Sequence, residues 1–278
     1  MIPESQPWYV EVPPPPALAN LVASLWEMRV PAHAETRVRI MPNACVDIVL
    51  YCAETSRGEG TASIVTPPHR SFVVGSTLRS FIMRSFGWNH VIGVSILPAG
   101  VEPILGLPAR VIGQTIALLD DVIGARAKEL EDRVLSGSAD RALGRFTEEL
   151  IRLRKSREAN AVIARAVNTV RGSGGTTRVD DIASSTNMTA RHLERNFLEH
   201  VGISPKLFAR LVRFDRVVRD IALRGGQTWS QFALAHGYSD QAHFINDFKE
   251  FAGVTPTQFE LESREQLNVS DFSNTSRP

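Results

Sequence analysis

Apolar residues recur every three or four positions in the C-terminal part of the chain, a spacing that predicts amphipathic helices. Helices are expected at 161–170 and 190–201, and 205–224 is nearly unbroken helical sequence. Further on, Phe244, Phe248 and Phe251 share one helical face. Gly237 before that face and Gly253 after it can end helices by taking a positive φ. The stretch 237–259 therefore predicts a turn, a helix, a second turn and the start of another helix.

The first half of the chain carries short runs of strand-forming residues, separated by Pro, Gly, Asn and charged residues. Two elements are expected before these strands: an N-terminal arm with four consecutive prolines, and a short helix at 17–25. Two amphipathic helices are expected to follow, at 122–134 and 139–153. This pattern predicts a small antiparallel barrel or sandwich with covering helices. The expected strands are 26–30, 36–41, 46–51, 63–66, 71–74, 78–86 and 91–97.

The helix expected at 139–153 allows two interpretations. Its apolar residues Leu143, Phe146, Leu150 and Leu153 follow a 3,4,3 spacing over two heptads. They could cover an open side of the barrel, or they could form a seam with a second subunit of a homodimer.

The C-terminal half contains an internal repeat. His192-Leu193, Phe197, Gly202-Ile203-Ser204-Pro205 and Phe208 line up at a constant offset with His243-Phe244, Phe248, Gly253-Val254-Thr255-Pro256 and Phe259. This repeat predicts two helix-turn-helix units joined by one long helix. Asn187 can take the left-handed turn in the first unit. Thr189 and Ser239 can cap the helices that follow the turns, and Thr177 to Asp180 has the form of a capping box.

The motif from Gly237-Tyr238 through His243-Phe244 and Phe248-Lys249 to Gly253-Val254-Thr255-Pro256 and Phe259 resembles the second helix-turn-helix signature of AraC/XylS-type bacterial transcription regulators. The resemblance extends over roughly 159–261. One departure is Glu260, where that family usually carries Arg or Lys. The resemblance implies an all-helical DNA-binding domain with two recognition helices.

In the first unit, the resemblance places Arg191, Glu194 and Arg195 where the recognition helix meets base edges. Arg can bind guanine through a bidentate fork, and Glu can accept a hydrogen bond from cytosine. The equivalent residues of the second unit are Ala242, Ile245 and Asn246. Ala242 or Ile245 could pack on a thymine methyl group, and Asn246 or Gln241 could read adenine. The full set of expected DNA-binding residues is Thr189, Arg191, His192, Glu194, Arg195, Ser239, Gln241, Ala242, His243, Ile245, Asn246 and Lys249.

Four segments of the first half resemble a sensor domain found upstream of some AraC-type DNA-binding domains. They are 15–19, 42–49, 72–75 and 93–100, the second containing Cys45-Val46-Asp47. Ala44 stands where that family often has Gly. The resemblance implies a regulatory role and names no ligand, so the effector-binding residues stay unknown.

Composition narrows the function further. The net charge is only +1, and 159–261 holds 12 Lys and Arg against 10 Asp and Glu, so charge alone would not suggest DNA.

Cys45 and Cys52 cannot form a disulfide framework or a four-ligand zinc site, and His192 and His243 are too isolated to bind a metal. No nucleophile elbow, phosphate loop or metalloprotease spacing appears, so we expect no enzyme activity, cofactor or metal. No apolar run approaches the roughly 20 residues that cross a bilayer, and the first residues lack a basic region followed by an apolar signal core, so we expect a cytoplasmic, nucleoid-associated protein.

The sequence thus predicts a two-domain α+β chain: a β-rich sensing or dimerisation domain at 1–155, a double helix-turn-helix DNA-binding domain at 159–261 and a disordered tail at 262–278. The expected function is ligand-responsive regulation of transcription at double-stranded promoter DNA, and an activator would also contact RNA polymerase. In the alternative, the N-terminal domain only dimerises or binds a protein partner, with no small-molecule effector.

Overall fold

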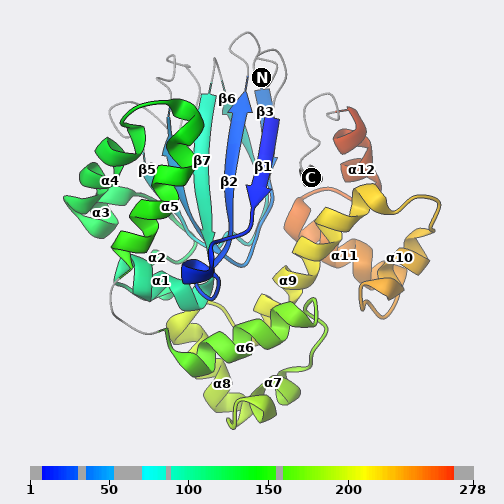
Figure 1. Cartoon of the computed structure of the whole chain (residues 1–278). Helices are drawn as coiled ribbons and strands as arrows, with labels where there is room; N and C mark the ends of the chain where they lie inside the picture. The colour runs from blue at the N-terminus through cyan, green and yellow to red at the C-terminus, as the bar shows by residue number, and fades with distance from the viewer. Residues whose placement is uncertain (1–7, 31–35, 53–70, 86–88, 155–158, 266–278) are drawn as a thin grey trace.

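A computed structural model describes residues 8–30, 36–52, 71–85, 89–154 and 159–265 of the chain. These ranges form a sheet domain followed by a helical domain (Figure 1). The strand expected at 63–66, the segment 155–158 between the domains and the tail beyond 265 lie outside the described residues.

An open antiparallel sheet is the centre of the first domain. Six strands pair in the order β1-β2-β7-β4-β5-β8, and β3 pairs with β6 in a separate ladder. Among the described strands β1 and β8 are edges that do not pair with each other, so the sheet does not close into a barrel. The antiparallel, β-rich prediction is confirmed. The strands are β1 (Trp8–Val12), β2 (Val22–Val30), β3 (Thr36–Ile40), β4 (Val46–Tyr51), β5 (Ser71–Val74), β6 (Phe81–Ser85), β7 (Asn89–Ile96) and β8 (Ile116–Leu118).

Helices cover one face of this sheet, as Figure 1 shows for α3, α4 and α5. Alternate residues of β4, such as Ile48 and Leu50, are fully buried in one cluster with Phe146 and Leu150 of α5. Leu153 is buried in the same cluster and Leu143 packs against it. Of the two interpretations of this helix, the one in which it covers the sheet is therefore confirmed, and the seam of these residues with a second subunit is wrong. The helices of this domain are α1 (Pro98–Leu105), α2 (Ala109–Ile112), α3 (Leu119–Ile123), α4 (Arg126–Leu135), the short 3-10 helix η2 (Ala139–Arg141) and α5 (Ala142–Leu153).

Three local predictions for the first domain are corrected. The helix expected at 17–25 is only a 3-10 turn, η1 (Pro16–Leu18), because the backbone from Val22 onward pairs with β7 as part of β2. The arm expected at the N-terminus contains β1, an edge strand paired with β2. The helix expected at 122–134 is divided between α3 and α4 at Gly124, whose φ of 64° interrupts a right-handed helix.

The second domain is entirely helical in its described residues and contains the repeated unit. The first helix-turn-helix is α7–α8, the second is α10–α11, and α9 connects them. The last helix continues through Glu265, four residues past the domain boundary expected at 261. The elements are α6 (Ala161–Gly172), α7 (Val179–Ser185), α8 (Ala190–His200), α9 (Pro205–Asp220), the 3-10 turn η3 (Ile221–Leu223), α10 (Trp229–Ala235), α11 (Gln241–Ala252) and α12 (Pro256–Glu265).

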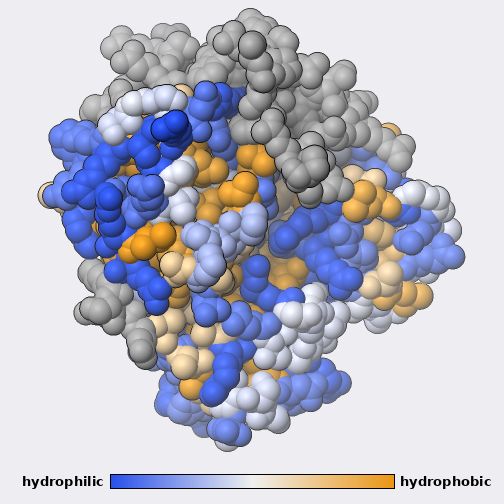
Figure 2. Space-filling model, in the orientation of Figure 1, coloured by the Kyte–Doolittle hydropathy of each residue, from blue (hydrophilic) through white to orange (hydrophobic). Residues whose placement is uncertain are grey.

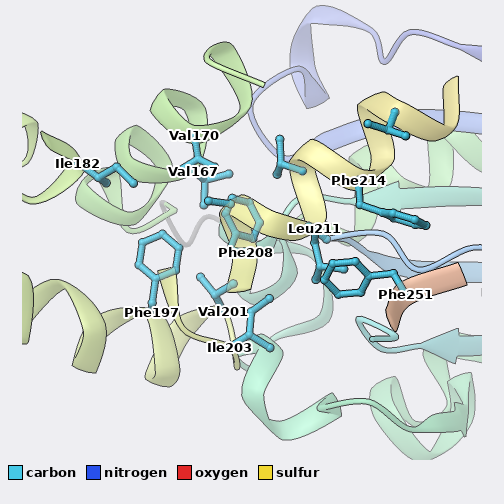
Figure 3. Packing of buried hydrophobic residues seen from close by; sticks show 14 of the residues in the cluster. Val167, Val170, Ile182, Phe197, Val201, Ile203, Phe208, Leu211, Phe214 and Phe251 are labelled. Atoms are coloured by element: carbon cyan, nitrogen blue, oxygen red, sulfur yellow. The ribbon is translucent and has the colours of Figure 1, made fainter. Parts of the chain in front are cut away.

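The connecting helix α9 supplies core residues to both units. Figure 3 shows Phe208 beside the first unit and Phe214 beside Phe251 of the second. The Phe208 ring lies 5.8 Å from that of Phe197 in α8, and the Phe214 ring lies 5.3 Å from that of Phe248 in α11. All of these aromatic side chains are fully buried or nearly so, and buried aromatic pairs contribute both area and ring contacts. Both recognition helices are thereby anchored to the same helix.

The sheet domain contacts both helix-turn-helix units. Its α1 packs against α6 and its α2 against α8. At the other unit, the Ser80 backbone N–H donates to Phe251 O at 2.8 Å and the Ser80 hydroxyl donates to Ala252 O at 2.6 Å. Arg39 donates to Ala252 O at 3.3 Å and pairs with Glu262 at 3.0 Å. These donors satisfy carbonyls that the C-terminal end of α11 would otherwise leave free.

Candidate nucleic-acid interface

The helix α8 is fixed at its N-terminus and along its inner face, which leaves the outer face free. Thr189 is its N-cap, and its hydroxyl accepts a hydrogen bond from the His192 backbone N–H at 3.2 Å. Leu193 and Phe197 have no exposed surface. The expected DNA-binding side chains of this unit are all exposed: Thr189, Arg191, His192, Glu194 and Arg195.

The cap of α11 differs from the sequence prediction. The helix begins at Gln241, so Asp240 is the N-cap, and its carboxylate accepts from the His243 backbone N–H at 2.7 Å. Ser239 lies one residue too early to cap, and its hydroxyl instead donates to Asp240 at 2.9 Å. The hydrogen bond from the His243 backbone N–H lowers the pKa of Asp240 most, and the hydrogen bond from the Ser239 hydroxyl lowers it further. A carboxylate here also interacts favourably with the positive end of the helix dipole.

The outer face of α11 is exposed but lightly charged. Ile245 is half-buried and packs against the domain core, so it presents less surface than its expected role on a thymine methyl group requires. The other expected residues on this helix and its turn are exposed: Ser239, Gln241, Ala242, His243, Asn246 and Lys249.

Internal partners hold most of the cations on α9, which leaves fewer charges of that helix available to a nucleic acid. Arg210 pairs with Asp247 and Glu250, and Arg219 pairs with Asp215. By contrast, within the described residues neither Arg191 of α8 nor Lys249 of α11 makes an ion pair. Arg195 contacts only a neighbour on its own helix, with its guanidinium nitrogen 3.4 Å from His192 Nδ1. Figure 2 shows a mainly hydrophilic surface over α7 and α8.

Several buried polar links that hold the second unit were not visible in the sequence. Arg210 Nε donates to Asp247 Oδ1 at 2.7 Å, and Asp247 is almost fully buried in α11. Arg224 binds both carboxylate oxygens of Glu260, at 3.1 and 3.0 Å, and its guanidinium lies 4.2 Å from the ring centre of Trp229. Glu260 is therefore a structural partner of Arg224, which accounts for its departure from the family pattern.

The cap expected for α7 is also wrong. The N-cap of α7 is Arg178, which makes no side-chain capping bond, so Thr177 to Asp180 is not a capping box. A complete capping box is found instead at α10, where Thr228 and Gln231 bond to each other's backbone N–H groups. Thr255 is placed as a cap of α12, since its hydroxyl accepts from the Gln258 backbone N–H at 3.3 Å.

Chemistry other than DNA binding finds little support in the described residues. No group of three or more His, Cys, Asp or Glu side chains there could hold a metal ion. Cys45 and Cys52 are not bonded to each other, and burial raises the pKa of the Cys45 thiol to about 12, which leaves almost no reactive thiolate. Within the same residues, every helix is too short or too polar to span a membrane.

Family comparisons agree with the two-domain division. Residues 182–261 match the helix-turn-helix domain family, a match that begins in α7 and ends in α12 and confirms the AraC-type resemblance of the C-terminal domain. Residues 10–117, from β1 to β8, match a family described as a domain of unknown function, DUF6597.

Two curated relatives are transcription regulators. The HTH-type transcriptional regulator ArgR of Pseudomonas aeruginosa is 27% identical over 99 residues, which are 36% of this chain and 29% of ArgR. An uncharacterized HTH-type transcriptional regulator of Haemophilus influenzae is 28% identical over 81 residues, which are 29% of this chain and 27% of that protein. The chain therefore matches less than a third of the length of either relative. Both are named as regulators and not as enzymes.

Two solved structures also resemble this chain. An AraC-type DNA-binding-domain protein from Chromobacterium violaceum is 24% identical and covers 37% of this chain and 91% of its own, with a TM-score of 0.34. ToxT from Vibrio cholerae is 12% identical and covers 92% of this chain and 98% of its own, with a TM-score of 0.45.

Proposed function

We propose that this chain regulates transcription and that α8 and α11, in its helix-turn-helix domain of the AraC type, bind successive major grooves of promoter DNA. The observation that carries this proposal is the repeated unit itself. Each copy holds a capped helix by buried aromatic or aliphatic side chains and turns its polar face outward. A capped helix with an exposed polar face is the element that helix-turn-helix proteins place in the major groove.

Within that arrangement we assign base reading chiefly to α8. Arg191 and Arg195 are exposed and can bind guanine O6 and N7, and Glu194 can accept from cytosine N4. On α11, Gln241 and Asn246 can read adenine and Ala242 can contact a thymine methyl group, while Lys249 can meet a phosphate. The first unit would then supply most of the specificity, and the second would supply register and a smaller share of base readout.

Regulation through the sheet domain is the finer part of the proposal. A signal received by that domain would act on DNA binding through its contacts with α11, because Ser80 and Arg39 bind the carbonyl groups at the end of that helix. Contact of α2 with α8 offers a second route. The described surface includes a hollow of about 150 Å³ between α4 and α5, lined by Arg126, Arg133 and Glu149 among others. It is smaller than the roughly 300 to 1,000 Å³ of most small-molecule sites, so it does not identify an effector site.

The alternative is that the sheet domain only dimerises or binds a protein partner. A thermal-shift screen of the full-length protein against a chemical library separates the two. A compound that both raises the unfolding temperature and changes DNA affinity supports sensing. A self-associating protein that no compound stabilises supports the alternative.

DNA binding itself is tested by sequencing the genomic fragments that full-length protein retains. The proposal predicts a small set of enriched intergenic fragments that share a motif, whose neighbouring genes would point to the signal. Retention of fragments without a common motif would reject sequence-specific binding.

A further inference from the structure

The turn 174–176, which leads into α7 of the first helix-turn-helix unit, meets the second unit at a junction midway along α9. The junction consists of the turn 174–176 after α6, the turn 236–239 between α10 and α11, and Arg213 of α9. Arg213 Nη1 donates to Gly237 O at 3.2 Å, and Nη2 donates to Gly175 O at 3.2 Å. One guanidinium therefore bonds at once to the turn that leads into the first unit and to the turn inside the second unit.

Close backbone packing surrounds this side chain. Gly175 has a φ of 78°, and a Cβ atom there would come within 2.8 Å of the Arg213 backbone nitrogen. A Cβ atom at Gly237 would come within 2.5 Å of the Thr176 Cγ2 methyl carbon. Because neither position has room for a side chain, the turn 174–176 packs closely against both α9 and the turn 236–239 of the second unit.

The junction continues into the second recognition helix. The Arg213 guanidinium lies 4.9 Å from the centre of the Tyr238 ring. Tyr238 is buried, and its hydroxyl donates to Asp247 Oδ2 at 3.3 Å. Asp247 lies in α11 and also binds Arg210 of α9. A series of polar contacts thus runs from the turn 174–176 through Arg213 and Tyr238 to the middle of α11.

The length of α9 alone does not set the separation of the recognition helices. Its 16 residues span about 24 Å, whereas successive major grooves are about 34 Å apart. The remaining distance depends on how each unit is seated on α9. Packing of Phe208 and Phe214 fixes each unit to α9 separately, and the junction adds direct contacts between the turn 174–176 and the second unit.

We infer that Arg213 is a positioning residue that locks the two helix-turn-helix units at one separation, so that the protein selects operators by the spacing of their half-sites. The inference rests on the proposed function, in which both units bind DNA. A planar guanidinium suits this role because its fork directs two hydrogen bonds at once, which the single ammonium of lysine cannot reproduce.

The DNA test uses the full-length protein and a set of duplexes in which the spacing between the two half-sites is changed one base pair at a time. Each added base pair moves one half-site by about 3.4 Å and rotates it by about 34°. We expect wild-type affinity to fall at least about tenfold for a change of one base pair, and that of Arg213→Ala to fall less than about threefold. Arg213→Lys should behave like Arg213→Ala, because it keeps the charge but loses the fork.

The control is Arg219→Ala, which removes a positive charge from the same helix at a residue whose partner, Asp215, also lies on α9. It should keep the wild-type spacing profile. If Arg213→Ala and Arg213→Lys both keep that profile while remaining folded, the inference is overturned.

A measurement without DNA separates this inference from the proposed function. Spin labels are placed at Leu198 of α8 and Lys249 of α11, two exposed and equivalent positions, in a variant with Cys45→Ala and Cys52→Ala. The distance distribution should be narrow with Arg213 and broad with Arg213→Lys. If the distance distribution is equally narrow with Arg213 and with Arg213→Lys, the positioning role of Arg213 is rejected whatever the DNA result. If the distribution broadens in Arg213→Lys but the protein binds no duplex specifically, the positioning role stands and the proposed function fails.

Discussion

Replacing Gly237 with alanine tests whether the turn that begins the second recognition helix depends on backbone geometry. Gly237 has a φ of 77°, a conformation that costs other residues about 1 to 2 kcal/mol. The new Cβ atom would also lie 2.5 Å from the Thr176 Cγ2 carbon, so the Thr176 side chain or the turn has to move. Together these effects should lower the free energy of unfolding by about 2 kcal/mol or more.

The assay is urea-induced unfolding of the full-length protein, followed by circular dichroism and by intrinsic tryptophan fluorescence. Gly144→Ala is the matched control. Gly144 lies within α5, and a Cβ atom there would meet nothing within 4 Å. Alanine should therefore stabilise that helix by about 0.5 to 1 kcal/mol. Equal stability of Gly237→Ala and the wild-type protein would refute the reasoning, because it would show that the turn tolerates a side chain.

Three further predictions concern binding, helix capping and pH. Arg195→Ala should weaken DNA binding by about 1 to 3 kcal/mol and relax the preference at one base position. The stability of the protein should change little, because the Arg195 side chain is exposed. If a selection of bound sequences returns the wild-type preference, Arg195 does not read a base directly. Asp240→Ala should cost about 1 kcal/mol of stability and Ser239→Ala much less, since Asp240 caps α11; similar losses in urea unfolding would contradict this assignment. Burial raises the pKa of Asp47 from 3.8 to about 6, so the folded protein binds this proton more tightly than the unfolded chain. The free energy of unfolding should then decline as the pH rises from about 4 to about 6, and Asp47→Asn should flatten the decline. An identical pH profile for the variant would show that Asp47 is not the titrating group.

Much of the helical domain could be predicted from the sequence because local rules determine it. The periodic apolar residues predicted α6, α8, α9 and α11, and the repeat predicted two equivalent units. The polar residues on α8 and most of those on α11 are exposed as expected, since a helix buries one face and leaves the other in water.

Several of the errors have one physical cause, because the structure at those residues depends on partners far away in the sequence. Val22 to Leu25 has helical periodicity but forms part of β2, because pairing with β7 outweighs the local preference of a short apolar run. Phe146 and Leu150 have the spacing of a dimer seam, but the sheet of the same chain covers them. Arg213, Arg210 and Arg224 bind groups 24 to 40 residues away, so no local pattern reveals those contacts.

The most direct test of the account is a selection in which full-length protein binds double-stranded DNA from a random library at physiological salt. We expect enriched sequences with two half-sites one helical turn apart, about 10 to 10.5 base pairs from centre to centre. One half-site should have the stronger base preference, and Arg195→Ala should relax the preference in that half-site, because the charged side chains of α8 are expected to read most of the bases. Enrichment of a single half-site, or equal retention of all sequences, would contradict the claim that both recognition helices read one operator.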